Sequence, residues 1–272
     1  MTAYFLKSFY FLLLLSLLAS RIIATLKNSS ESGEAKCIEK ERQALLSFKE
    51  GLIDNFGILS TWINNTDCCK WKRIQCNSHT GHVQLLHLHG NYPYTPYLGG
   101  EINVSSLIHL PYIQHIDLSR NYFALSYIPE LMGSITNLRY LDLFHSCFSG
   151  RIPSTLGNLL LLRYLNLGEN FLWGKIPIEI GNIKHLQYLD LGLYYLSGKI
   201  PSQIGNIRML QHLSLGSNTP PYGWKRRNDI SNSLSGAIPF RIGNLPLLHT
   251  LQLVGNFEIK VEDAQWLSTL HS

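Results

Sequence analysis

Apolar and polar residues recur along the chain in units of about two dozen residues. Most units carry two leucines separated by one residue, and an asparagine follows three residues after the second leucine, in the pattern L-x-L-x-x-N. The second leucine of the pattern falls at Leu88, Leu118, Leu143, Leu167, Leu191, Leu215 and Leu253. The four positions from Leu143 to Leu215 are each 24 residues apart. Paired leucines at this period predict one short strand per unit and a parallel sheet that grows by one strand at each repeat.

Alternation within each strand assigns its side chains to two faces. Leu165 and Leu167 turn into the core, so Tyr164, Asn166 and Gly168 face the opposite, concave side. Equivalent positions of neighbouring units form columns across the strands, and we take these columns as the candidate ligand-binding surface. Its candidate residues are His115, Asp117, Tyr140, Asp142, Tyr164, Asn166, Tyr188, Asp190 and His212.

The aromatic members of this surface allow two interpretations. Rings in one column, at one residue per strand, offer a large and rigid contact area to a peptide, a glycan or a protein. The same rings can instead pack on one another along the ladder, and composition does not decide between the two. The acidic column repeats at the strand spacing of about 4.8 Å. Because no further catalytic motif accompanies it, we expect a polar or ligand-contact face and no enzyme.

Glycine, proline and asparagine recur at the turns between strands. Asparagine occupies one corner, where a buried amide satisfies backbone groups that a turning chain would otherwise strand. The corner asparagines are Asn91, Asn121, Asn170, Asn218 and Asn256, and Ser146 and Tyr194 interrupt the series. An Ile-Pro pair follows Gly150, Gly174, Gly198 and Gly236. Glycine permits a bend, proline fixes φ, and the Gly-Asn steps that follow predict a short helical turn on the convex side.

Together these patterns predict an α/β repeat: a leucine-rich-repeat right-handed solenoid with a concave parallel sheet. The recurring motif L-x-G-x-I-P-x-x-L/I-G-N closely resembles that of the plant-specific class of extracellular leucine-rich repeats. The resemblance covers residues 83–272, where we expect about seven repeats. A solenoid needs a cap over the apolar end of its first repeat, and we assign residues 27–82 to an N-terminal cap domain.

The cap is expected to be helical and bonded by disulfides. The segment from Glu39 to Leu52 predicts an amphipathic helix with Leu45 and Phe48 on its apolar face. Four cysteines lie in the cap: Cys37, Cys68, Cys69 and Cys76. Spacing alone allows three pairings, and a zinc site is disfavoured because no Cys-x-x-Cys set accompanies the adjacent Cys68 and Cys69. The segments around Phe48 and Cys68 resemble the cap of plant leucine-rich-repeat receptors and receptor-like proteins, which implies pairing of Cys37 with Cys68 and of Cys69 with Cys76.

The start of the chain predicts secretion. An apolar run begins at Phe9 after Lys7 and is too short to span a bilayer, so residues 1–26 are expected to be a signal peptide. The cysteines fit an oxidising compartment, and Cys147 is expected to be a buried free thiol. Candidate glycosylation sites are Asn28, Asn64 and Asn103. The net charge of +5 does not indicate a nucleic-acid partner.

Histidines gather near the first repeat, at His79, His82, His87 and His89. His87 and His89 share one strand face by alternation. No carboxylate or cysteine nearby in the chain completes a ligand set, so we expect surface histidines, no metal site and no cofactor.

Two irregularities lie near the end of the chain. The spacing from Leu215 to Leu253 exceeds one period, and the excess falls in an insert, residues 219–232, that contains Trp224 and adjacent basic residues. This insert is expected to be a tolerated basic loop or a retained intron, and the alternative is a functional loop that contacts an anionic partner. The last unit stops at Ser272 without a cap, which suggests a truncated solenoid or a fragment.

The resemblance implies a recognition function. It identifies the chain as the ectodomain start of a plant receptor-like protein that acts in defence or developmental signalling. Such an ectodomain binds an extracellular peptide, glycan or protein ligand and works with receptor kinase co-receptors at the outer face of the plasma membrane. The alternatives are a secreted inhibitor of microbial cell-wall-degrading enzymes, similar to polygalacturonase inhibitors, and a truncated product without function.

Overall fold

The computed structural model describes residues 35–123, 126–192, 195–216, 233–235 and 245–253. The chain divides into two units, residues 1–35 and 36–272, and the second contains nearly all of the described residues. Several predictions lie outside the described residues: the signal peptide, Asn28, the corners at Tyr194, Asn218 and Asn256, the bend at Gly236, the insert 219–232 and everything after residue 253.

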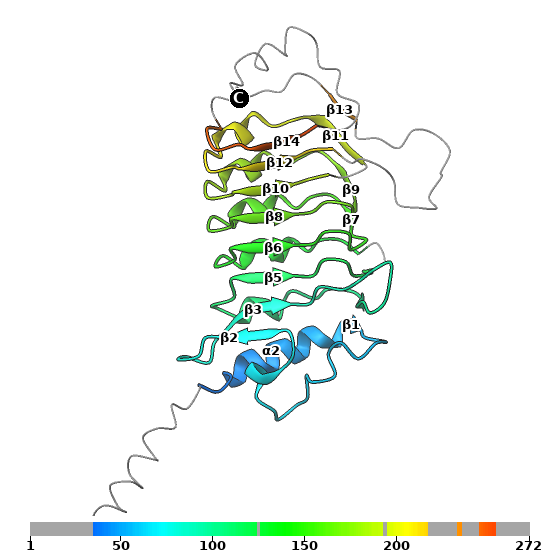
Figure 1. The fold of residues 1–272 in the computed structure, drawn as a ribbon, viewed down its shortest axis with the longest axis vertical. Coiled ribbons are helices and arrows are strands. Elements are labelled where there is room, and N and C mark those ends of the chain that lie inside the picture. The colour runs from blue at the N-terminus through cyan, green and yellow to red at the C-terminus, as the bar shows by residue number, and fades with distance from the viewer. Residues whose placement is uncertain (1–34, 124–125, 193–194, 217–232, 236–244, 254–272) are drawn as a thin grey trace, which may run out of the picture. The chain divides into compact units, whose positions relative to one another are not determined.

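A parallel sheet runs through the described repeats from Val83 to Gln252 (Figure 1). Its parallel strands are β3 (Val83–His87), β5 (His115–Asp117), β6 (Tyr140–Asp142), β8 (Tyr164–Asn166), β10 (Tyr188–Asp190), β12 (His212–Ser214) and β14 (Thr250–Gln252). These are the seven strands predicted from the leucine pattern. One strand of the cap, β2 (Ile74–Cys76), extends the sheet by pairing antiparallel to β3.

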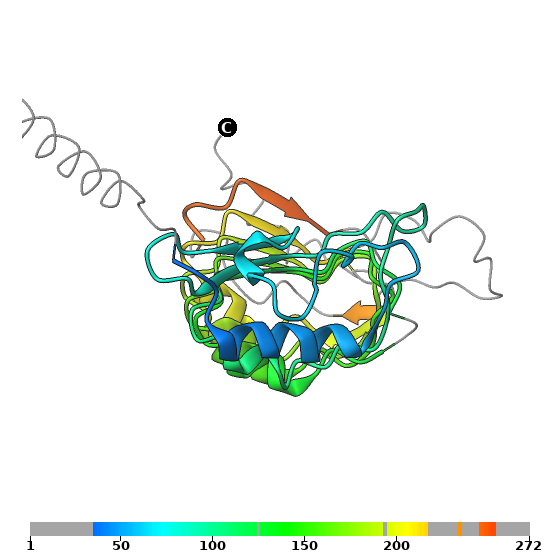
Figure 2. The same cartoon turned by 90° about the horizontal axis from the view of Figure 1, so that it is seen from below.

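Several of the described coils also carry a short strand and a 3-10 turn away from this sheet. A second parallel sheet contains β7 (Ser149–Gly150), β9 (Phe171–Gly174), β11 (Tyr195–Lys199) and β13 (Ser233–Ser235). The 3-10 turns are η3 (Glu130–Ser134), η4 (Ser154–Asn158), η5 (Ile178–Asn182) and η6 (Ser202–Asn206). A view along the stack shows the turns and the long sheet on opposite sides of the coil (Figure 2). The helical turns were predicted, whereas the second sheet was not.

The glycines of the repeat serve close packing and bending. Gly150, Gly174 and Gly198 have φ of +89°, +91° and +81°, a region that favours glycine, which confirms the predicted bends. In η4, a Cβ on Gly157 would overlap the carbonyl oxygen of Glu179 in the next coil. The Gly-Asn step therefore lets successive 3-10 turns approach each other.

The predicted corner holds for two of the described asparagines and fails for one. Asn170 is fully buried; its Nδ2 donates to the carbonyls of Leu143, Leu167 and Gly168, and its Oδ1 accepts from two further backbone amides. Asn121 is buried in the same way, and Ser146 fills the corner between them through its hydroxyl. Asn91 is exposed instead, because residues 91–96 close a loop of their own through the bond from the Asn91 amide to Pro96.

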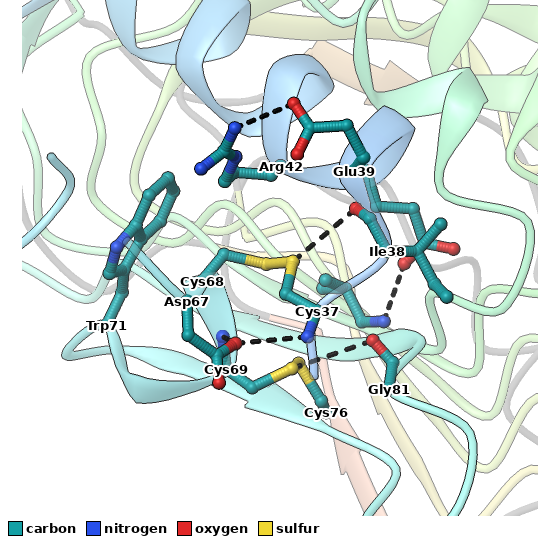
Figure 3. Close-up of a disulfide and its surroundings, with 12 residues drawn as sticks. Cys37, Ile38, Glu39, Arg42, Asp67, Cys68, Cys69, Trp71, Cys76 and Gly81 are labelled. Atoms are coloured by element: carbon teal, nitrogen blue, oxygen red, sulfur yellow. Dashed lines mark hydrogen bonds and ion pairs between the residues drawn. A yellow bond between two sulfur atoms is a disulfide. The ribbon is translucent and has the colours of Figure 1, made fainter. Parts of the chain in front are cut away.

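The cap covers the first repeat with a helix and two disulfides. Helix α2 (Glu39–Glu50) buries Leu45 and Phe48 as predicted and ends two residues early, because Leu52 enters β1 (Leu52–Ile53), which pairs with β4 (Gly99–Gly100). The remaining short elements are η1 (Cys68–Lys70) and η2 (Leu107–His109). Figure 3 shows the two disulfides, Cys37–Cys68 and Cys69–Cys76, which confirm the implied pairing. Asp67 Oδ1 accepts hydrogen bonds from the backbone amides of Cys37 and Cys69. It therefore links the segment before α2 to the segment that carries the second disulfide.

The structure also bears on the predictions for Cys147 and for the glycosylation sites. Cys147 is buried and free, as expected. Asn64 and Asn103 are exposed, so an oligosaccharide is sterically possible at both, and their glycosylation stays a prediction. No helix among the described residues is long and apolar enough to cross a membrane.

Candidate ligand-binding face

The aromatic column forms one continuous stack across five strands. His115 lies 4.0 Å from Tyr140, Tyr140 lies 4.2 Å from Tyr164, and Tyr164 lies 4.3 Å from Tyr188, measured between ring centroids. His212 closes the stack 4.2 Å from Tyr188. The planes of these pairs differ by 12° or less. We call these five residues the aromatic ladder.

Stacking limits what a ligand can touch on this ladder. Each inner ring has both faces covered by its neighbours, so only ring edges and hydroxyl groups remain for a ligand. The hydroxyls of Tyr140 and Tyr164 both donate to Asp142 Oδ2, at 3.1 and 3.3 Å. Packing along the ladder is thus confirmed, and ligand contact by the same residues stays a prediction.

The polar column beside the ladder is more deeply buried than alternation alone suggests. The exposed fractions of Asp117, Asp142 and Asn166 are 5%, 8% and 6%. In each, Oδ1 accepts from the backbone amide two residues later, and Asp190 does the same toward Gly192. These side chains terminate the strands, and Asp142 and Asn166 also hydrogen-bond to ladder tyrosines, so only a small part of each is available to a ligand.

Burial sets the protonation of the face. It raises the pKa of Asp142 to about 6, although Phe144 N, Tyr140 and Tyr164 donate hydrogen bonds to its carboxylate. Burial also raises the pKa of Asp190 and of Tyr140, Tyr164 and Tyr188. The pKa of His115 and that of His212 are lowered by burial. The ladder is therefore neutral at physiological pH, with phenol hydroxyls that act as donors.

A third column supplies positive charge. The residue that precedes each ladder tyrosine or the last histidine is Arg139, Arg163, Gln187 or Gln211. Together with the ladder from Tyr140 to His212, these four side chains line an open pocket of about 410 Å³. Within the described part of the chain, neither guanidinium lies within ion-pair distance of a carboxylate. The sequence interpretation missed this column, although its register with the tyrosines was visible in the repeat.

The histidines near the first repeat do not act as one group. His79 is exposed, and His82 pairs with the buried Glu41 at 2.5 Å. The ring of His89 bonds to the hydroxyl of Ser119 at 2.8 Å. His87 lies beside Asp117, with 3.3 Å between Nδ1 and Oδ2.

Two family models match the chain. The leucine rich repeat N-terminal domain matches residues 38–77, and the leucine-rich repeat region matches residues 118–270. The chain belongs to the leucine-rich-repeat proteins. Among curated plant receptor-like proteins, receptor-like protein EIX2 of Solanum lycopersicum is 48% identical over 130 residues, which cover 46% of this chain and 13% of the tomato protein. The chain thus spans only a small part of the length of that relative.

Solved structures similar to this leucine-rich-repeat chain are ectodomains of plant receptors. The PEPR1–AtPEP1 structure has a TM-score of 0.66 and 32% identity, and the match covers 82% of this chain and 32% of that one. The Arabidopsis receptor kinase HAESA, in complex with the peptide hormone IDA and the co-receptor SERK1, has a TM-score of 0.55 and 28% identity, with 81% and 42% coverage. These similarities support recognition of an extracellular ligand as the general role of the fold.

Proposed function

We propose that this chain is the N-terminal, ligand-recognising part of a plant receptor-like protein, and that it binds an extended peptide segment carrying a carboxylate. The observation that carries the proposal is the pocket in which two guanidinium groups, without a carboxylate partner among the described residues, stand beside the aromatic ladder. A carboxylate bound between Arg139 and Arg163 makes charge-assisted hydrogen bonds, which are stronger than neutral ones.

The rest of the pocket suits a peptide backbone. Gln187 and Gln211 provide amide donors and acceptors at the same register as the two arginines. The ring edges and hydroxyls of Tyr164 and Tyr188 lie next to them and keep their orientation through stacking. A segment that crosses successive strands would meet one polar side chain and one aromatic edge at each repeat.

The cellular setting follows the relatives. PEPR1 and HAESA are seen with peptides, and HAESA also with a co-receptor. By analogy, the complete protein acts at the outer face of the plasma membrane in defence or developmental signalling and relies on a receptor kinase partner.

A displayed library of random linear peptides, selected on the full purified chain, tests the proposal. Enriched peptides should contain Asp, Glu or a free C-terminal carboxylate, and their affinity should fall at least tenfold for the double variant Arg139→Ser/Arg163→Ser, because two charge-assisted bonds are lost. Arg208→Ser is the matched control, since Arg208 is exposed and does not line the pocket. Peptides without acidic groups, or equal binding by the double variant, would contradict the proposal.

A further inference from the structure

One cluster of metal-ligating side chains lies at the N-terminal end of the aromatic ladder, outside the proposed peptide pocket. His87 on β3 stands opposite Asp117 on β5 in the strand register, and His115 precedes Asp117 by two residues on the same face. One ligand atom from each of the three side chains lies within 4.8 Å of the other two. The sequence was expected to hold no metal set because no carboxylate is near the histidines along the chain, and parallel pairing supplies one.

The distance between His87 and Asp117 matches that between two ligands of a small divalent ion. Two ligands bound tetrahedrally to zinc at about 2.0–2.1 Å are about 3.3–3.4 Å apart. His87 Nδ1 and Asp117 Oδ2 are separated by 3.3 Å. The His115 ring is 5.8 Å from the His87 ring, between centroids, and tilted by 35° to it, so the two imidazoles converge from adjacent strands.

Two of the three groups are held in place by the fold. Asp117 is only 5% exposed, and its Oδ1 accepts from the amide and the hydroxyl of Ser119, at 2.9 and 2.6 Å. These bonds leave Oδ2 directed toward His87. His115 is fixed by its stack on Tyr140, in which the planes differ by 8°. Outer-shell contacts of this kind orient metal ligands and strengthen binding.

The third group gives access from solvent. The side chain of His87 is 57% exposed, so an ion can enter, and water can occupy the remaining coordination positions. Two imidazoles and one carboxylate favour borderline ions such as Zn²⁺ over Ca²⁺ or Mg²⁺, which prefer all-oxygen sites. By contrast, the cluster of Cys37, Cys68 and Cys69 offers no ligands, because its sulfurs are joined in disulfides.

We propose that His87, His115 and Asp117 form a binding site for a divalent transition-metal ion of the zinc class, with three protein ligands and open positions toward solvent. A bound ion adds positive charge at one end of the aromatic ladder. Its open positions can accept a carboxylate or imidazole from a ligand on the concave face. The site does not depend on the proposed peptide binding.

Calorimetric titration of the tag-free, chelator-treated full chain with ZnCl₂ tests this site. The repeats supply conservative variants: tyrosine occupies the His115 position in β6, β8 and β10, and asparagine occupies the Asp117 position in β8. His115→Tyr and Asp117→Asn should therefore fold, as a thermal melt will show, yet each should weaken Zn²⁺ binding at least tenfold. His212→Tyr, at the other end of the ladder, is the matched control and should bind as the parent does.

The outcomes separate cleanly. Saturable binding of Zn²⁺ but not of Mg²⁺ by the parent, weakened at least tenfold in both His115→Tyr and Asp117→Asn, supports the site. Absence of saturable binding by the parent, equal affinity in these two folded variants, or equal loss in His212→Tyr overturns it.

Discussion

The cap and the repeats bury their apolar surfaces by different means. The cap relies on features that occur once: helix α2, two disulfides, and Trp62 stacked on Trp71 at 5.4 Å. Both indole N–H groups donate hydrogen bonds within the cap: that of Trp62 to Lys72 O and that of Trp71 to Thr66 Oγ1. In the described repeats, one corner, one ladder position and one strand end recur in several successive coils. A position in the repeats therefore has neighbours that show which substitutions the fold accepts, and a position in the cap has none.

The largest effect is expected at a repeat corner. Asn170→Ala removes five hydrogen bonds to buried backbone groups and should lower the free energy of unfolding by about 4 kcal/mol. Asn170→Ser copies the solution seen at Ser146 and should lose about half as much. Urea unfolding of both variants measures the difference. Equal losses would show that a neighbour's solution cannot be transferred.

Much of this fold could be predicted from the sequence because the same sequence pattern recurs in successive repeats. The leucine pattern located seven strands, and the Gly-x-Ile-Pro words located the bends and the 3-10 turns. The second sheet was missed because strands such as Phe171–Gly174 are short and lack sustained alternation. Asn91 was misplaced because its loop closes on itself, which depends on tertiary context.

The candidate site was accessible only in outline. Alternation gave the direction of Asp142 and Asn166 but not their burial, since burial depends on tertiary packing against neighbouring coils. The pairing of His87 with Asp117 follows from aligning Leu88 with Leu118, so the repeat register did contain this signal. A search limited to nearby residues in the chain overlooked it.

The second-largest loss of stability is expected when the disulfides are removed. The cap has no repeated position that shows which substitution the fold accepts there. Cys37 and Cys68 are 31 residues apart, and Cys69 and Cys76 are 7 apart. On the loop-entropy model, Cys37→Ser/Cys68→Ser should cost about 3–4 kcal/mol and Cys69→Ser/Cys76→Ser about 2 kcal/mol. Chemical unfolding of the two double variants provides the comparison. A larger loss for the shorter loop would mean that local packing outweighs chain entropy.

The joint between the two regions should show a smaller effect. Glu41 of α2 is 2% exposed, and its Oε2 accepts from the Val83 amide at 2.7 Å, where the first repeat strand begins. Glu41→Ala leaves that amide without its partner and should cost about 2–3 kcal/mol. Hydrogen exchange should accelerate at Val83 first. Glu39→Ala is the control, because Glu39 is exposed and should change little; unaltered exchange at Val83 would remove Glu41 as the joint.

The smallest predicted change is a gain, at a position where the repeats vary their own chemistry. Burial raises the pKa of Asp142 to about 6, above the ordinary value near 4. The folded chain then keeps this proton to a higher pH than the unfolded chain does, so this group lowers the free energy of unfolding as the pH rises from about 4 to 6. Asp142→Asn removes that penalty and should stabilise the chain by about 1–2 kcal/mol at pH 7, with little effect at pH 4.

Asn166 makes the reciprocal test possible, because it holds the same strand-end position one coil later and bonds the Gly168 amide as Asp142 bonds that of Phe144. Asn166→Asp should introduce the penalty and destabilise the chain at pH 7 but not at pH 4. Thermal melts at both pH values compare the two variants. If Asp142→Asn loses stability at pH 7, the carboxylate contributes more through Tyr140 and Tyr164 than its burial costs, and this coil, like the cap, depends on a residue that its neighbour cannot replace.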